Sequence, residues 1–146
     1  MRTFGLLILG GILMTSCVKT TVESTSEPET DGVFIHISEG YDDAHRALMP
    51  LKMATIMADD KDVLIYMDIH AVNLLVKGAE DLIYDGFESA HTYIKQLVDI
   101  GVEIYACPTC LEVAGFTAND LMSGIQNAQK DKFFNFTEGR MITLDY

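Results

Sequence analysis

The sequence GVEIYACPTCLEVAGF, residues 101–116, contains the pattern from which the fold class of this chain follows. An apolar run, VEIYA, comes after Gly101 and leads into Cys107, Pro108 and a short helical pattern that ends at Gly115. The run is typical of a buried strand, and proline is preferred at the first position of a helix. The stretch therefore predicts a strand that passes through Cys107 directly into a helix.

Further strands and helices are predicted on both sides of this stretch. Apolar runs indicate strands at 32–38, 62–69, 102–106, 124–128 and 140–146. Helical spacing of apolar residues indicates helices from Asp42 or Asp43 to Ala58 and from Ser89 to Ile100, with shorter ones after Thr117 and at 130–136. Pro50 is expected to kink the first of these helices or to restart it. Strands that are apolar on both faces and alternate with helices predict an α/β domain with a mainly parallel sheet covered on both sides.

The first 31 residues have a different character. Residues 1–16 contain one cation, Arg2, and an apolar run too short to span a bilayer, as in a signal peptide. Cys17 follows this run and resembles the acylated cysteine of a bacterial lipoprotein. Residues 17–31 are rich in Thr, Ser and Glu and predict a flexible tether, so the α/β domain is expected at 32–146. A lipid-anchored protein of the cell envelope, on the periplasmic or outer-surface side, is the localisation that this pattern predicts.

The charge of the chain limits its partners. It has 22 acidic and 10 basic residues and a formal net charge of -12. An acidic surface repels phosphate backbones, and no cluster of Lys and Arg offsets this repulsion. Nucleic acid is therefore not expected as a partner.

Reactive residue types follow three of the predicted strands. They are His36, Ser38 and Glu39 after the first strand, Asp68 and His70 after the second, and Cys107 and Cys110 after the third. Because ligands bind at the carboxyl ends of parallel strands, we expect a functional site at this edge of the sheet.

Cys107 and Cys110 have four interpretations. As N-cap of the next helix, Cys107 would accept hydrogen bonds that favour its thiolate, and Cys110 would lie within reach for redox or sulfur chemistry. A structural disulfide across so short a loop would contribute only about 2 kcal/mol. The cysteines could instead be buried packing residues, or two ligands of a zinc or copper ion that a histidine such as His36 or His70 completes.

The order of these elements resembles the DsrE/DsrF-like family, in its YchN-like branch. The similarity rests on GVFIHISEG, on DVLIYMD, on the final RMITLDY, and on Cys107 followed by Gly115 eight residues later. It implies a three-layer, flavodoxin-like fold with five mainly parallel strands, and homo-oligomers such as trimers or hexamers. Family members with known roles are cytoplasmic and carry a persulfide on the cysteine that matches Cys107. The export signal and the additional Cys110 of this chain favour dithiol–disulfide chemistry.

Three functional hypotheses follow. In the first, the anchored domain handles sulfur or thiol redox equivalents as a sulfur carrier, sulfurtransferase or thiol–disulfide protein. Cys107 is then the nucleophile, Cys110 the resolving thiol and His36 the proton acceptor. No cofactor is expected. A partner protein with a thiol is expected. The second hypothesis is a zinc- or copper-binding module, and the third is an interaction subunit without chemistry.

Overall fold

A five-stranded, fully parallel sheet forms the centre of the domain in the computed structural model, which describes residues 29–133 and 135–146. The strands follow the order β4-β3-β2-β1-β5, so β1 lies between β2 and β5. Their bounds are β1 Gly32–Ile37, β2 Asp62–Met67, β3 Glu103–Ala106, β4 Ile125–Asn127 and β5 Met141–Asp145. The fold class predicted from the sequence is confirmed. The predicted signal peptide, Cys17 and most of the tether lie outside the described residues.

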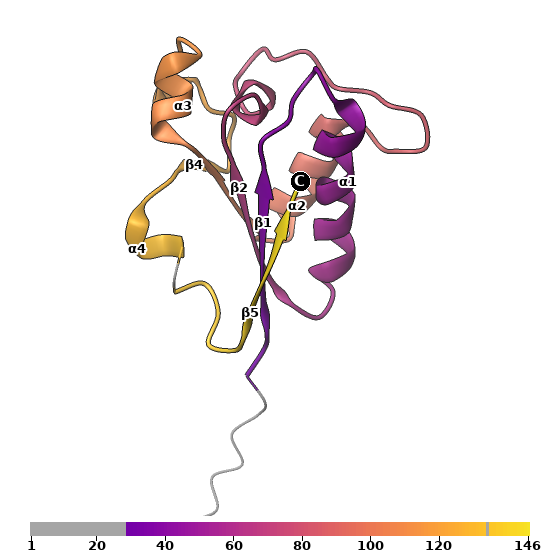
Figure 1. Ribbon diagram of the computed structural model, residues 1–146, viewed down its shortest axis with the longest axis vertical. Coiled ribbons are helices and arrows are strands. Elements are labelled where there is room, and N and C mark those ends of the chain that lie inside the picture. The colour runs from indigo at the N-terminus through magenta and orange to yellow at the C-terminus, as the bar shows by residue number, and fades with distance from the viewer. Residues whose placement is uncertain (1–28, 134) are drawn as a thin grey trace, which may run out of the picture.

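Helices lie on both sides of the sheet (Figure 1). The long helices α1 (Ala44–Met57) and α2 (Ala90–Asp99) pack together on one side, and the short helices α3 (Pro108–Val113) and α4 (Lys130–Phe133) lie on the other. The 3₁₀ turns η1 (Ala71–Leu74) and η2 (Ala118–Asp120) complete the connections. In the described residues no helix has the length and apolar character needed to cross a bilayer.

Local sequence signals account for several helix boundaries. The Asp43 side chain accepts a hydrogen bond from the Arg46 amide at the start of α1, and Ser89 accepts one from Thr92 at the start of α2. Residues 117–120 form the predicted capping box. Pro50 lies inside α1, which continues to Met57 as one helix, so the predicted restart at this proline is wrong. Pro50 is buried on the packed side of α1, where the helix continues past it without the amide donor that proline lacks.

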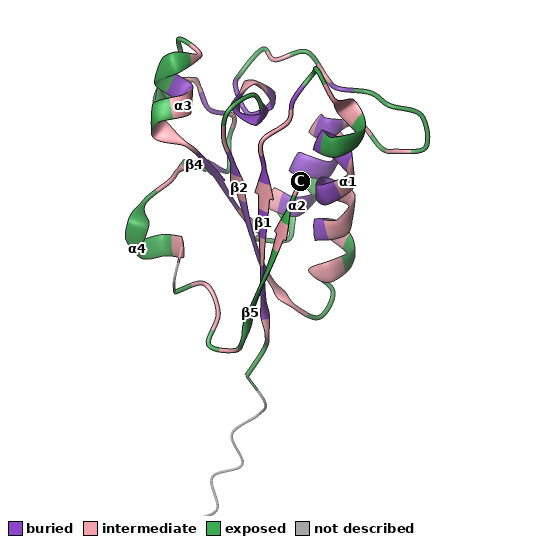
Figure 2. Ribbon diagram, viewed as in Figure 1, coloured by how far each residue is buried: buried purple, intermediate pink, exposed green. Residues whose placement is uncertain are grey.

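The two faces of the sheet differ in composition because successive strand residues point to opposite sides. We call one side the aliphatic face. Its residues pack in the core under α1 and α2, and burial there is nearly complete (Figure 2). They are Val33, Ile35, Ile37, Val63, Ile65, Met67, Ile104 and Ala106.

The opposite side, which we call the aromatic face, carries Phe34, His36, Tyr66 and Tyr105. Phe133 of α4 contacts three of their rings edge-on, with ring centroids 5.9 Å from Phe34, 5.1 Å from Tyr66 and 5.7 Å from Tyr105. The cover over this face is partial, since Tyr105 is buried beneath it but α4 has only four residues. Phe34, His36 and Tyr66 stay partly exposed as a result.

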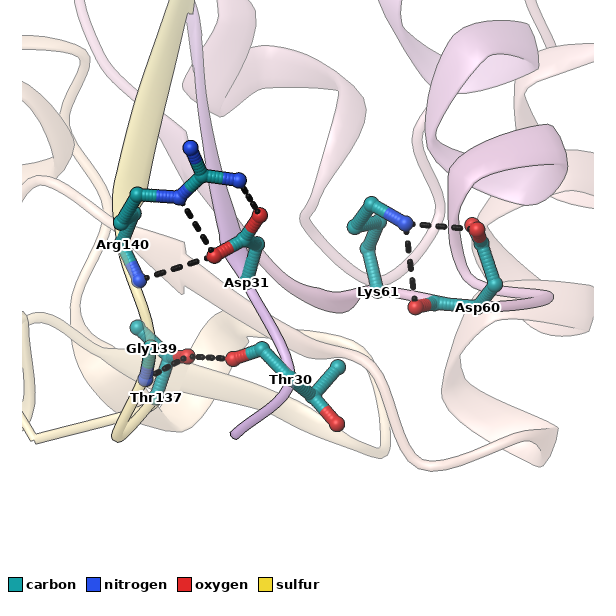
Figure 3. A network of polar contacts seen from close by, with 7 residues as sticks. All are labelled: Thr30, Asp31, Asp60, Lys61, Thr137, Gly139 and Arg140. Atoms are coloured by element: carbon teal, nitrogen blue, oxygen red, sulfur yellow. Dashed lines mark hydrogen bonds and ion pairs between the residues drawn. The ribbon is translucent and has the colours of Figure 1, made fainter. Parts of the chain in front are cut away.

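The edge strand β5 is tied to β1 at its start (Figure 3). The Arg140 guanidinium pairs with the Asp31 carboxylate at 2.6 Å and 3.1 Å, and the Gly32 amide donates to the Arg140 carbonyl at 2.7 Å. The Thr137 hydroxyl donates to the Thr30 carbonyl at 2.7 Å. These contacts fix the register that places Asp145, at the end of β5, beside His36.

Candidate functional site

Polar side chains converge at the carboxyl edge of the sheet on its aromatic face. Ser38, Asp68 and Cys107 are the first residues after β1, β2 and β3. In each strand the alternation of side chains puts them on the same side as His36, Tyr66 and Tyr105. The Cys107 amide also donates to the Met67 carbonyl at 2.9 Å, which brings the cysteine next to Asp68.

Cys107 occupies the N-cap of α3, as the sequence predicts. Its backbone is extended, Pro108 takes the first helical position, and Cys107 Sγ accepts a hydrogen bond from the Cys110 amide with an N···S distance of 3.3 Å. Both cysteines are free thiols and both are half-buried. The pair is therefore neither sealed in the core nor joined in a disulfide.

The two thiols have opposite electrostatic environments. Burial opposes ionisation of Cys107, but hydrogen bonds from the Cys110 thiol, the Tyr66 hydroxyl and the amides of Cys110 and Thr109 outweigh it and hold the pKa of Cys107 below its ordinary value. Burial and the hydrogen bond to Cys107 raise the pKa of Cys110, and the Ile69 amide opposes this only in part. Since α3 has just six residues, these individual donors are the cause, rather than a helix dipole.

Tyr66 is a site residue that the sequence reasoning missed. It takes part in the hydrogen bonding of Cys107, and its ring stacks on His36 with centroids 5.6 Å apart and an interplanar angle of 24°. Burial and the hydrogen bond to Cys107 raise the pKa of Tyr66, so the hydroxyl stays a donor at neutral pH. The signal was present in the alternation of β2, because Tyr66 stands two residues before Asp68 and so shares its side of the sheet.

His36 is held between two carboxylates. Its Nε2 lies 2.9 Å from Asp68 Oδ2, its Nδ1 lies 3.1 Å from Asp145 Oδ1, and Ser38 Oγ is 3.4 Å from Nε2. The other oxygen of Asp68 is buried and has no hydrogen-bond partner among the described residues. No described contact joins His36 directly to either cysteine, whereas Tyr66 contacts both His36 and Cys107. The imidazole is therefore one side chain away from the sulfur.

The remaining predicted residue, His70, lies at the same edge, in the lining of a pocket that Cys110 shares. Its side chain is exposed, and its Nδ1 is 4.0 Å from Asp42 Oδ2. Across residues 29–133 and 135–146, no three side chains of His, Cys, Asp or Glu are grouped so that they could hold a metal ion. The site brings together an ionisable thiol, a protonated neighbouring thiol, a phenol and a histidine–carboxylate cluster. Such a set can form and break sulfur–sulfur bonds.

A parallel α/β sheet with a cysteine at the end of its third strand defines the class of protein, and the sequence comparison identifies the family. The sequence model of the DsrE/DsrF-like family matches residues 31–138. The chain belongs to this family. A search of curated proteins gave no match.

Two solved structures share the fold. The YchN protein from E. coli superposes with a TM-score of 0.61 and 14% sequence identity, covering 80% of this chain and 100% of that chain. MTH1491 from Methanobacterium thermoautotrophicum, described as a protein of unknown function, has a TM-score of 0.54 and 23% identity, covering 77% of this chain and 98% of that one. At these identities the likeness extends to the fold alone.

Proposed function

We propose that this protein handles sulfur or thiol redox equivalents through Cys107 and Cys110, as a lipid-anchored domain outside the cytoplasm. One observation carries the proposal: hydrogen-bond donors surround Cys107 Sγ and lower the pKa of this thiol, while the neighbouring Cys110 keeps its proton. A thiolate is the reactive form of cysteine in sulfur transfer. Membership of the DsrE/DsrF-like family supports sulfur chemistry at this position.

The proposed reaction begins with a persulfide donor, R–S–SH. The Cys107 thiolate attacks the outer sulfur, a new S–S bond forms at Cys107, the donor S–S bond breaks and R–S⁻ leaves. The persulfide can then pass its outer sulfur to an acceptor thiolate in the same way. Alternatively, the Cys110 thiolate attacks Cys107 Sγ, which gives the Cys107–Cys110 disulfide and releases hydrosulfide. A dithiol protein is the partner that would reduce this disulfide.

His36 is the proposed proton acceptor. Both of its ring nitrogens face carboxylate oxygens, of Asp68 and Asp145, so a proton from the thiol pair would reach it through Asp68. The metal-binding alternative lacks a comparable observation in the described residues.

Anchoring and assembly also belong to the proposal. The position of Cys17 directly after the apolar run supports acylation at this residue. Homo-oligomers are supported by the thin cover over the aromatic face and by the edge strand β5, where Met141 and Ile142 are exposed. Exposed apolar residues on an edge strand are typical of surfaces that pair with another chain.

Mass spectrometry of protein from its native envelope, with Cys107→Ser and Cys110→Ser as variants, tests the proposal. After exposure to inorganic polysulfide and alkylation, we expect one added sulfur at Cys107 in wild type. Cys107→Ser should lose the added sulfur completely. Cys110→Ser should keep the persulfide but form no disulfide. The same spectra should show acyl chains on Cys17. An unmodified Cys107 that alkylates no faster than free cysteine would contradict the proposal.

A further inference from the structure

An apolar pocket of about 440 Å³ opens beside Cys110. Ile69, Val113 and Ala114 supply its apolar wall, and Cys110 lies in the lining together with His70 and Asn73. The volume falls in the range of small-molecule sites, which are about 300–1,000 Å³. Its position means that a bound molecule would touch one thiol of the pair directly.

The backbone of Ile69 has a conformation that isoleucine disfavours. Its φ is 43°, and among the non-glycine residues that the structure describes it is alone in having a positive φ. A β-branched side chain in this left-handed region is a rare and costly exception. Glycine or asparagine would hold the same backbone with less strain. The side chain is also 55% exposed, so burial in the core does not explain why isoleucine stands here.

The local contacts of Ile69 indicate what the strained backbone does. The neighbouring amides of Asp68 and His70 donate to the carbonyls of Ile37 and Ser38, both at 3.0 Å, which fixes the chain on either side. In this conformation the Ile69 amide is close enough to Cys110 to lower the pKa of that thiol, against the larger effect of burial. The backbone of Ile69 thus lies beside one thiol of the pair, while its exposed side chain forms a wall of the pocket at the same thiol.

The charges around the pocket select against anionic ligands. Its lining contains no lysine or arginine, and His70 pairs with Asp42. Asp68 lies close enough to Cys110 to raise the pKa of that thiol. Together with the net charge of -12, these groups repel carboxylate-bearing thiols. An uncharged, apolar group therefore suits both the apolar wall of the pocket and the negative charge around it.

We propose that this pocket binds the uncharged apolar group R of a small organic persulfide, R–S–SH, and presents its outer sulfur to the thiol pair. The proposal rests on the proposed function and names its substrate class. With R held against Ile69 and Val113, the Cys107 thiolate attacks the outer sulfur of the neutral persulfide. The S–S bond of the donor breaks, and R–S⁻ leaves with its electron pair and takes a proton from water.

The test compares three sulfur donors on the full chain: benzyl persulfide, glutathione persulfide and inorganic polysulfide. The readout is the rate at which one sulfur atom is added at Cys107. Burial of an apolar ring is expected to make benzyl persulfide about tenfold faster than glutathione persulfide. Inorganic polysulfide has no R group and reports on the thiol pair itself.

Two variants and a matched control sharpen the test. Val113→Asp adds a carboxylate to the pocket at a residue that is 85% exposed, and Ile83→Asp adds the same charge at a 75% exposed residue outside the lining. We expect Val113→Asp, and not Ile83→Asp, to lower the benzyl persulfide rate about tenfold. Ile69→Gly should lower the benzyl persulfide rate without lowering the urea midpoint of unfolding, because glycine removes the backbone strain.

The outcomes separate the two proposals. Equal rates for benzyl and glutathione persulfide, or equal effects of the two aspartates, would overturn the pocket proposal and leave the proposed function standing if polysulfide still reacts. Failure of all three donors to modify Cys107 would overturn the proposed function as well.

Discussion

The two faces of the sheet differ in how completely helices cover them and in the side chains they carry. The aliphatic face is sealed under two long helices and contains the core, with Ile35, Ile65 and Met67 fully buried. The aromatic face has a four-residue helix over it and carries His36 and Tyr66, which lead to the thiol pair at its carboxyl edge. Because neighbouring residues of each strand point to opposite faces, core residues and candidate site residues occupy alternate positions of the same short segments. The comparison therefore predicts that a substitution on the aliphatic face changes stability, whereas a substitution of the adjacent residue on the aromatic face changes the alkylation of Cys107.

The largest expected effect is on the aliphatic face. Ile65→Ala removes a fully buried side chain from the core and should lower the free energy of unfolding by about 2–5 kcal/mol. In the protein that remains folded, the alkylation rate of Cys107 should stay the same, since Ile65 points away from the site. Urea denaturation and iodoacetamide kinetics on the same sample would measure both. A fall in the alkylation rate of the folded fraction would show that the two faces are coupled.

The next effect concerns the neighbouring residue on the aromatic face. Tyr66→Phe removes a hydrogen bond that stabilises the thiolate, so the pKa of Cys107 should rise and its alkylation at neutral pH should slow. A hydrogen bond to an ionised acceptor such as this thiolate is stronger than a neutral one, so its loss should move the midpoint of alkylation clearly to higher pH. The pH profile of alkylation measures this shift.

Tyr105→Phe is the matched control for Tyr66→Phe. Tyr105 pairs with Tyr66 across β2 and β3 and contacts the same Phe133 ring, but it is not among the groups that shift the pKa of Cys107. Its substitution should leave the alkylation profile in place. If both tyrosines shift the profile equally, the effect comes from the packing of the face and not from the hydroxyl of Tyr66.

The sequence predicted the aliphatic face better than the site, for a physical reason. Apolar periodicity and helix caps such as Asp43 and Ser89 are local signals, and the strands and helices they predicted are present. A cysteine followed by proline was also a local signal, and the structure confirms that Cys107 is the N-cap of α3.

Other features of the site depend on which strands become neighbours. Asp145 reaches His36 only because β5 returns next to β1, a pairing separated by 109 positions in the chain. Tyr66 reaches Cys107 only because β2 pairs with β3 in one register. The left-handed backbone of Ile69 likewise follows from its fixed neighbours, since isoleucine itself favours extended conformations. Tertiary pairing of this kind is not readable from residue spacing.

The smallest expected effect tests the edge strand that brings Asp145 to the aromatic face. Side-chain and backbone hydrogen bonds from Arg140 lower the pKa of Asp31 from its ordinary value of 3.8. A carboxyl whose pKa is lower in the folded state stabilises the fold above its unfolded pKa, and this contribution is lost as the pH falls through the folded value. Asp31→Asn should therefore reduce stability slightly at neutral pH and converge with wild type in acid. Urea midpoints between neutral pH and the acid range measure the difference.

Asp60→Asn is the control for this pair. Asp60 forms an equally short ion pair, 2.6 Å from Nζ of the adjacent Lys61, but that pair joins neighbours in one turn and connects no strands. Its removal should change the midpoint less than Asp31→Asn does. Two outcomes would mean that β5 is held by its backbone hydrogen bonds alone. Either both substitutions lower the urea midpoint equally, or the difference in midpoint between Asp31→Asn and wild type stays constant into the acid range. The aromatic face would then keep Asp145 beside His36 without the Asp31–Arg140 pair.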